Sequence, residues 1–215
     1  MKKKNYVILM AVCMGMLTLT GCVKVVKTGE EAALTGAVSF NAGDNVANFW
    51  DTTALPEMEG KAADLAELLN SASGDLSSLA SEDYAKYSMG DQGELTYTVK
   101  GMANITEVVT DKKAGYITIK LDGYDGADVI KLQIGTVFKG TSVRDSLNFI
   151  DFNDYTNQIE WAEVSQSINS LIQNNVIDPI GYEAFEVGKN IEFIGAFTVG
   201  SSGEILITPT KLAIQ

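Results

Sequence analysis

The densest group of side chains that could bind a ligand lies in the second half of the chain. Arg144 and Asp145 are followed by three amides, Asn153, Asn157 and Gln158. An arginine with amides beside it can hold a sugar, a carboxylate or the backbone of a partner protein. In the alternative, Arg144 pairs with a carboxylate, and the amides cap a helix and satisfy loop backbone groups. The residue types alone leave both interpretations open.

Two aromatic residues, Phe149 and Phe152, flank this polar cluster. Aromatic rings can stack on sugar rings or bases, so both residues join the candidate ligand or partner site. Core packing is the alternative, because large apolar side chains at such spacings are usually buried. The same two interpretations apply to the other aromatic residues of this kind, which are Phe49, Trp50, Tyr155 and Trp161.

Catalytic motifs are missing from the sequence. The 215 residues include no histidine, which excludes a Ser-His-Asp triad, a Cys-His pair and a histidine-ligated zinc site. Carboxylate pairs such as Asp51 with Glu57, or Asp151 with Asp154, would hydrolyse a glycosidic bond only at a specific separation across a cleft. Chance pairs are expected among 28 acidic residues. We therefore predict a protein that is not an enzyme and uses no cofactor.

A short acidic loop is the one place that resembles a metal site. Asp122, Asp125 and Asp128 lie close together with two glycines between them. Their spacing does not match a calcium-binding EF-hand loop, and no glutamate follows at the twelfth position. A hairpin turn explains these residues better. We predict no metal site.

The chain is acidic, with 16 Lys and Arg against 28 Asp and Glu and a formal charge of -12. Binding to nucleic acid phosphates requires clustered basic residues. We therefore expect no nucleic acid partner. The hydrophobic fraction of 46% is typical of a globular protein and excludes a disordered chain.

Residues 1–21 form a predicted signal peptide. Three lysines precede the apolar run from Tyr6 to Leu19, which is too short for a stable membrane span. The sequence Leu-Thr-Gly before Cys22 resembles a bacterial lipobox, in which the cysteine carries acyl chains such as palmitate. Cys13 leaves with the signal, so Cys22 has no disulfide partner in the mature chain. We predict a lipid anchor at Cys22 and an extracytoplasmic body, in the periplasm or outside the cytoplasmic membrane; the alternative is a plain secretory signal.

The spacing of apolar residues divides the rest of the chain. Residues 22–40 are predicted to be a lipidated tether, and residues 41–90 a small helical subdomain. Helical spacing recurs in three short segments, 46–50, 65–72 and 76–84, and Pro56 is expected to break the chain after the first.

Residues 91–215 show the alternation of β-strands on either side of one helix. The predicted strands cover 95–99, 117–121, 130–134, 191–199 and 205–214, and the helix covers about 154–178. This order of elements is that of the OB-fold. The predicted fold class is therefore α+β, with an OB-fold-like five-stranded antiparallel β-barrel, a long helix between strands 3 and 4, and the helical subdomain before it.

The segment from residue 135 to 160 resembles a known family. It contains Gly-Thr-Ser-Val-Arg-Asp (140–145), Phe-Ile-Asp-Phe (149–152) and Asn-Gln-Ile (157–159). This pattern is similar to that of the predicted periplasmic lipoproteins grouped as domain of unknown function 2291. The likeness covers nearly the whole mature chain and extends to residues 48–56, 61–69, 99–101, 193–197 and 207–209. It implies an OB-like barrel with a helical subdomain, and an envelope lipoprotein often encoded beside sugar ABC transporters, but no established activity.

Three hypotheses on function follow, in decreasing order of preference. The first is a non-enzymatic, lipid-anchored binding or accessory module of an ABC-type sugar uptake system, which predicts binding to a transporter component or a sugar. The second is a carboxylate-dependent enzyme acting on sugars or envelope glycans, which predicts a cleft with two acidic groups. The third is a structural or assembly factor, which predicts a broad apolar or aromatic surface patch.

Overall fold

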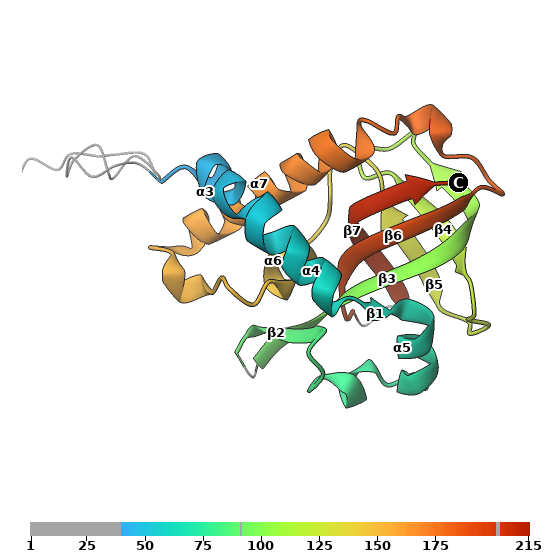
Figure 1. Cartoon of the computed structure of the whole chain (residues 1–215), viewed down its shortest axis with the longest axis horizontal. Helices are drawn as coiled ribbons and strands as arrows, with labels where there is room; N and C mark the ends of the chain where they lie inside the picture. Colours follow the sequence, from blue (N-terminus) through green and yellow to red (C-terminus); the bar gives the residue numbers. More distant parts are fainter. Residues whose placement is uncertain (1–39, 91, 201–202) are drawn as a thin grey trace, which may run out of the picture. The chain divides into compact units, whose positions relative to one another are not determined.

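The computed structural model describes residues 40–90, 92–200 and 203–215 (Figure 1). The predicted signal peptide, Cys22 and almost all of the predicted tether lie outside these residues. Phe40–Gln215 form one compact unit. Figure 1 shows most of its strands gathered on one side of this unit and the helices α3, α4 and α7 on the other.

The central sheet closes on itself. In the described part of the chain, five strands form this ring: β3 (Gln92–Val109), β4 (Tyr116–Leu121), β5 (Val129–Gln133), β6 (Asn190–Thr198) and β7 (Glu204–Ile214). They pair in the order β3-β4-β5-β7-β6, and β6 pairs again with β3. The first part of β3 pairs with β6 and its last part with β4, so one long strand joins both ends of the ring.

The ring is not strictly antiparallel, and this part of the prediction is wrong. Strands β5 and β7 run parallel, with Ile130 opposite Ile205. The other neighbours around the ring run antiparallel. The reason is geometrical, because an odd number of strands cannot alternate in direction all the way around a closed ring. With five strands in the described ring, one parallel pair is required.

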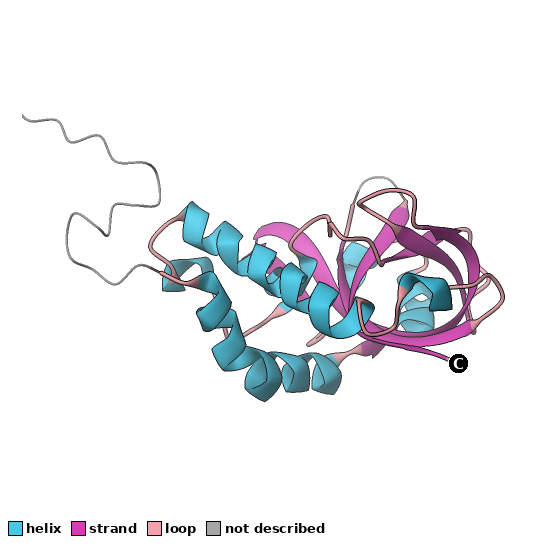
Figure 2. Cartoon of the chain, turned by 90° about the horizontal axis from the view of Figure 1, so that it is seen from above, coloured by secondary structure: helices cyan, strands magenta, loops and turns pink. Residues whose placement is uncertain are grey.

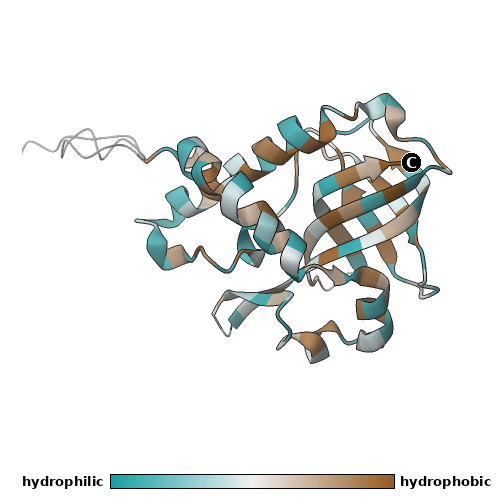
Figure 3. Cartoon of the chain, in the orientation of Figure 1, coloured by the Kyte–Doolittle hydropathy of each residue, from teal (hydrophilic) through white to brown (hydrophobic). Residues whose placement is uncertain are grey.

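Alternating side chains fill the interior of the ring, as the period-2 pattern predicts. Fully buried residues there include Tyr97, Val99, Ile117, Leu132, Phe193 and Ile207. The second core lies between the helices and the outer face of the ring, and contains Val46, Met58, Leu147, Ile168 and Ala196. In Figure 3, hydrophobic and hydrophilic residues alternate along the strands and along α7, which matches these two cores.

The first helices form a continuous row. α3 (Ala42–Phe49) runs into a π-helical segment, η1 (Trp50–Ala54), and then into α4 (Leu55–Lys61). Pro56 does not break the chain, contrary to the prediction. It occupies the first turn of α4, where a helix tolerates the missing N–H, and the wider π turn precedes it.

The remainder of 41–90 is less helical than predicted. It contains β1 (Ala63–Asp64), α5 (Leu65–Ala72), the 3-10 turn η2 (Leu76–Leu79) and β2 (Ala85–Met89). The helix predicted over 76–84 is only this short turn, in which the Asp75 side chain caps Ser77. Both β1 and β2 pair with β3, which is long enough to hold them in addition to its ring partners.

The chain between β5 and β6 provides the second row of helices. It contains α6 (Ser142–Ser146), the 3-10 turn η3 (Phe152–Asp154), α7 (Gln158–Ile172), the π-helical segment η4 (Gln173–Ile177) and the 3-10 turn η5 (Tyr182–Ala184). Asn157 caps α7, as its position before Glu160 predicts. Figure 2 shows the two rows of helices beside the strands.

Candidate functional site

Arg144 and Asp145 point into the protein and bind each other. The Arg144 Nε and Nη2 atoms donate to Asp145 Oδ1 at 2.8 and 2.6 Å, and the two side chains are only 9% and 4% exposed. Arg144 Nη1 donates to the carbonyl of Trp161 at 2.9 Å, and the guanidinium lies 4.0 Å from the centre of that ring. Thr141 donates its hydroxyl to the Asp145 carboxylate. The pair thus makes these contacts inside the protein, and its role in binding stays a prediction.

The three amides lie on the surface and do not gather around the guanidinium. The Asn157 side chain accepts from the backbone N–H groups of Ile159 and Glu160, and Asn153 Nδ2 donates to Asp151 Oδ1 at 2.9 Å. Gln158 is exposed at the first position of α7. Among the described residues, no hydrogen bond joins these amides to Arg144, so the predicted cluster is divided between the interior and the surface.

Phe149 and Phe152 are partly exposed, each resting on another ring. Phe149 meets Phe49 edge-on at 5.1 Å between ring centres, and Phe152 meets Trp161 edge-on at 6.3 Å. One side of each ring therefore packs on the protein while another part remains open to solvent. These two residues remain available for contact with a ligand or a partner.

Two lysines outside the predicted cluster hold the loop that follows α6. Lys61 Nζ donates to the carbonyl of Ser146, and Lys86 Nζ donates to the carbonyls of Leu147 and Ile150. Burial lowers the pKa of Lys86, and the nearby Lys61 charge adds to this effect. The acceptors are backbone carbonyls, which have no signature in a sequence, so no pattern could have predicted these contacts.

The carboxylate of Glu57 supports the same loop. Its Oε1 atom accepts from the backbone N–H of Asn148 at 2.8 Å and from Lys61 Nζ at 2.6 Å. The lysines and this carboxylate fix the path of the chain between α6 and α7. Residues before position 90 thus hold part of the segment 135–160 in place.

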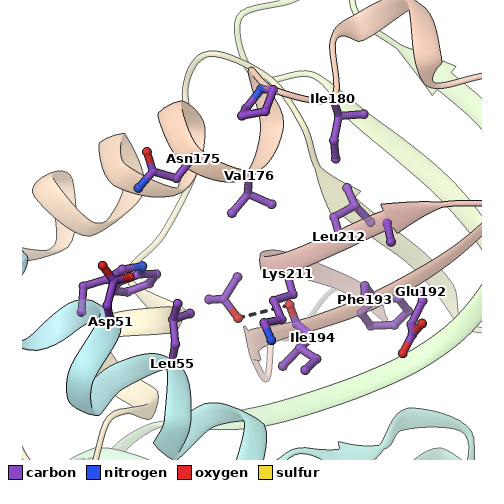
Figure 4. A pocket seen from close by; sticks show the side chains of 14 residues that line it. Asp51, Leu55, Asn175, Val176, Ile180, Glu192, Phe193, Ile194, Lys211 and Leu212 are labelled. Atoms are coloured by element: carbon purple, nitrogen blue, oxygen red, sulfur yellow. Dashed lines mark hydrogen bonds between the residues drawn. The ribbon is translucent and has the colours of Figure 1, made fainter.

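A groove of about 570 Å³ lies between the two rows of helices and the strands β6 and β7. We call it the groove; it is shown in Figure 4. Its apolar lining includes Leu55, Val176, Ile180, Phe193 and Leu212, with buried Trp50 behind them. Ligand pockets in proteins have about 300 to 1,000 Å³ and a mainly apolar lining. The size and lining of the groove are therefore those of a site for a small molecule.

Polar groups of different kinds also line the groove. The carboxylates of Asp51 and Glu192 and the amide of Asn175 belong to exposed residues (Figure 4). Lys211 contributes an ammonium group, which pairs with Glu59 at 2.5 Å. These residues come from η1, η4, β6, β7 and α4, so no local motif could have predicted that they meet. Only the register of β6 on β7 and the packing of the helices bring them together.

A smaller cavity of about 250 Å³ lies near the start of β4 and the end of β5. Its polar lining includes Lys131, which donates to Glu204 at 2.6 Å and lies 4.4 Å from the ring centre of Tyr116. The hydrogen bond from Glu204 raises the pKa of Lys131. Because its volume falls below the range of about 300 to 1,000 Å³ that is usual for ligand pockets, this cavity is a weaker candidate than the groove.

Neither metal sites nor membrane spans are found in the part of the chain that the structure describes. No three acidic, cysteine or histidine side chains there lie close enough to hold a metal ion. In the loop that resembled a calcium site, Tyr124 donates its hydroxyl to Asp128. None of the described helices is both long and apolar enough to cross a bilayer.

Comparisons with known proteins agree with the fold and identify the family. The crystal structure of an OB-fold protein (tm0957) from Thermotoga maritima MSB8 is similar, with a TM-score of 0.64 and 21% identity over 83% of this chain and 100% of that chain. No curated protein matches. The family model described as predicted periplasmic lipoprotein (DUF2291) matches residues 12–213, as the resemblance predicted. The chain therefore belongs to this family, which fits an exported lipoprotein of the cell envelope.

Proposed function

We propose that this protein is a non-enzymatic, lipid-anchored binding module of the cell envelope and that it holds a small ligand in the groove. The observation that carries the proposal is the groove itself, with about 570 Å³ of space and an apolar lining interrupted by a few polar groups. Such a combination is typical of small-molecule sites, in which apolar contacts supply affinity and polar groups supply orientation. The strands that frame it, β6 and β7, belong to the closed ring.

The chemistry of the groove favours a sugar or a glycoside. The exposed carboxylates of Asp51 and Glu192 can accept hydrogen bonds from hydroxyl groups, and the Asn175 amide can both donate and accept. Leu55 and Leu212 provide apolar contacts for the ring carbons or an aglycone. A role beside an ABC-type sugar uptake system is part of this proposal, and its support is the family resemblance together with this chemistry.

A thermal-shift screen of the purified protein against mono- and oligosaccharides tests the groove. A ligand that binds the folded state raises its Tm by mass action. The shift should disappear in Asp51→Asn and Glu192→Gln, which remove charges of the groove. It should persist in the matched control Glu183→Gln, because Glu183 is an exposed acid outside the groove. A sugar-dependent shift that survives both groove variants would place the ligand elsewhere.

The lipid anchor has its own test. Cells expressing the full chain and grown with a labelled fatty acid should yield labelled protein. The label should be lost in Cys22→Ser and kept in the control Cys13→Ser, because Cys13 belongs to the predicted signal peptide. Label retained by Cys22→Ser would contradict an anchor at this residue.

Asp51 and Glu192 also keep the enzyme hypothesis open as a second candidate, since two carboxylates line one groove. Incubating the protein with the sugars that bind distinguishes the two functions. A binding module returns the sugar intact, whereas a glycosidase releases products and loses this activity in Asp51→Asn or Glu192→Gln.

A further inference from the structure

A second surface combines exposed apolar side chains with acidic ones. Phe149, Phe152 and Ile159 are 36%, 38% and 42% exposed and lie between α6 and the first turn of α7. We call this surface the aromatic face. It shares no residue with the lining of the groove. Large apolar groups exposed together on a soluble domain are typical of interaction sites.

The exposed rings rest on other rings, which limit their movement. Phe152 packs on Trp161, Trp161 packs on Tyr155 at 5.0 Å, and Tyr155 packs on Phe40 at 5.7 Å. The Tyr155 hydroxyl also donates to Asn45 at 3.2 Å. A side chain that is already held in place loses less entropy when it binds, which is the property of an anchor residue at an interface.

Acidic residues dominate the chain segments that form the aromatic face. The stretch 145–188 contains eight Asp and Glu and no Lys or Arg, and the stretch 40–60 contains four acidic residues and no basic one. Asp151 and Asp154 adjoin Phe152 in the chain, and Glu163 lies one helical turn from Ile159. Asp44 belongs to α3, which packs on α7. The nearby cations already have partners: Arg144 is buried and paired with Asp145. The half-buried Lys61 and Lys86 donate to backbone carbonyls of the 146–150 loop.

We propose that the aromatic face docks a partner protein that presents an apolar pocket surrounded by Lys and Arg. Interface anchors are commonly aromatic, and complementary charges around them steer the encounter and reject other partners. An anionic lipid surface would repel these carboxylates. A second copy would bring the same acidic rim against itself, because a two-fold interface uses one patch twice. A basic protein surface is therefore the occupant that the charges favour.

The position of this face restricts where the partner lies. The described chain begins at Phe40, which packs on Tyr155 within the same group of rings. The 18 residue-to-residue steps from Cys22 to Phe40 span at most about 65 Å when fully extended. This step rests on the lipid anchor proposed above and places the partner in the membrane or within that distance of it.

Site-specific photocrosslinking in intact cells tests the proposal on the full chain. The probe is p-benzoylphenylalanine, placed at Phe149 or Phe152, where an exposed aromatic residue already stands. Controls at Val129 and Val187, which are 45% and 66% exposed, carry the same probe away from the aromatic face. We expect a discrete crosslinked protein from positions 149 and 152 only. Mass spectrometry after digestion with a protease that does not cleave at Lys or Arg should place the crosslink in a segment that contains Lys or Arg.

Charge reversal sharpens the test. Asp44→Lys with Glu163→Lys should lower the crosslinking yield at least several-fold, whereas Glu183→Lys, away from the face, should not. The proposal would be overturned by an unchanged crosslinking yield in the double variant or by equal yields from the control positions. It would also be overturned if the probe crosslinked only to lipid or only to a second copy of the chain. The anchor is judged separately, because protein crosslinks that persist in Cys22→Ser would uphold the docking surface while contradicting the membrane-bound position.

Discussion

The Arg144 cluster and the groove bring polar groups together in opposite ways. Arg144 and Asp145 are adjacent in the sequence, buried, and hydrogen bonded to each other. The groove takes Asp51, Asn175 and Glu192 from three distant segments and leaves them exposed. Neighbouring polar residues can therefore be buried and paired with each other, while residues from separate segments line the candidate ligand site. Variants whose stability and ligand binding are measured separately test this difference between the Arg144 cluster and the groove.

Replacing Arg144 by alanine should have the largest effect on stability. The variant would leave the Asp145 carboxylate buried without its guanidinium, and breaking a buried ion pair in this way costs about 3–5 kcal/mol. Chemical denaturation measures the loss as a lower free energy of unfolding. The double variant Arg144→Ala, Asp145→Ala should recover part of it. Wild-type stability in the single variant, together with lost ligand binding, would instead make Arg144 a binding residue.

The Asn157→Ala variant should have an intermediate effect. Its side chain caps α7 by accepting from two backbone N–H groups, and loss of such a cap costs about 1 kcal/mol. The neighbouring variant Gln158→Ala is the control, because exposed Gln158 makes no side-chain hydrogen bond among the described residues and should change the free energy of unfolding by less than about 0.5 kcal/mol. Equal effects of the two variants would exclude the capping role.

The groove variants should have little effect on stability. Glu192 is exposed, so Glu192→Gln is expected to change the free energy of unfolding by less than about 0.5 kcal/mol while removing the ligand-dependent rise in Tm. Denaturation with and without the sugar that binds measures both quantities. A large loss of stability without ligand would assign Glu192 to the fold and remove the contrast with Arg144.

The pH dependence of Lys86 gives the finest test of the loop contacts. Burial lowers its pKa below the ordinary value of 10.5, so the unfolded chain holds the proton at pH values where the folded protein has released it. The resulting destabilisation is complete below the folded pKa and is lost as the pH rises toward 10.5. Across that window the free energy of unfolding should rise more steeply in the wild type than in Lys86→Met. Identical slopes in denaturation series would contradict a buried ammonium.

Patterns within short stretches of sequence predicted the strands and the helix cap, because these depend mainly on neighbouring residues. Alternation located the strands that carry Tyr97, Ile119 and Leu132, and the position of Asn157 predicted the cap of α7. The order of elements also led to the OB-fold, which the similar crystal structure supports.

The sequence-based predictions were wrong where contacts between residues far apart in the chain determine the structure. The parallel pairing of β5 and β7 follows from closing a ring with an odd number of described strands, which no single segment reveals. Strand β2 forms because β3 offers it a partner, although its own alternation is weak. The groove depends on the packing of η1 and η4 on β6 and β7, so its residues carry no common motif.

The closure of the ring has a consequence for export. Thr96 in β3 pairs with Thr198 in β6, and their hydroxyl groups meet across 102 positions of sequence. Contacts this distant make folding slow, because a long loop must close before the pairing is formed. The ring cannot close until residue 198 has crossed the membrane, when almost the whole chain has emerged. The topology thus leaves the core of the protein unfinished until almost the whole chain is available to fold.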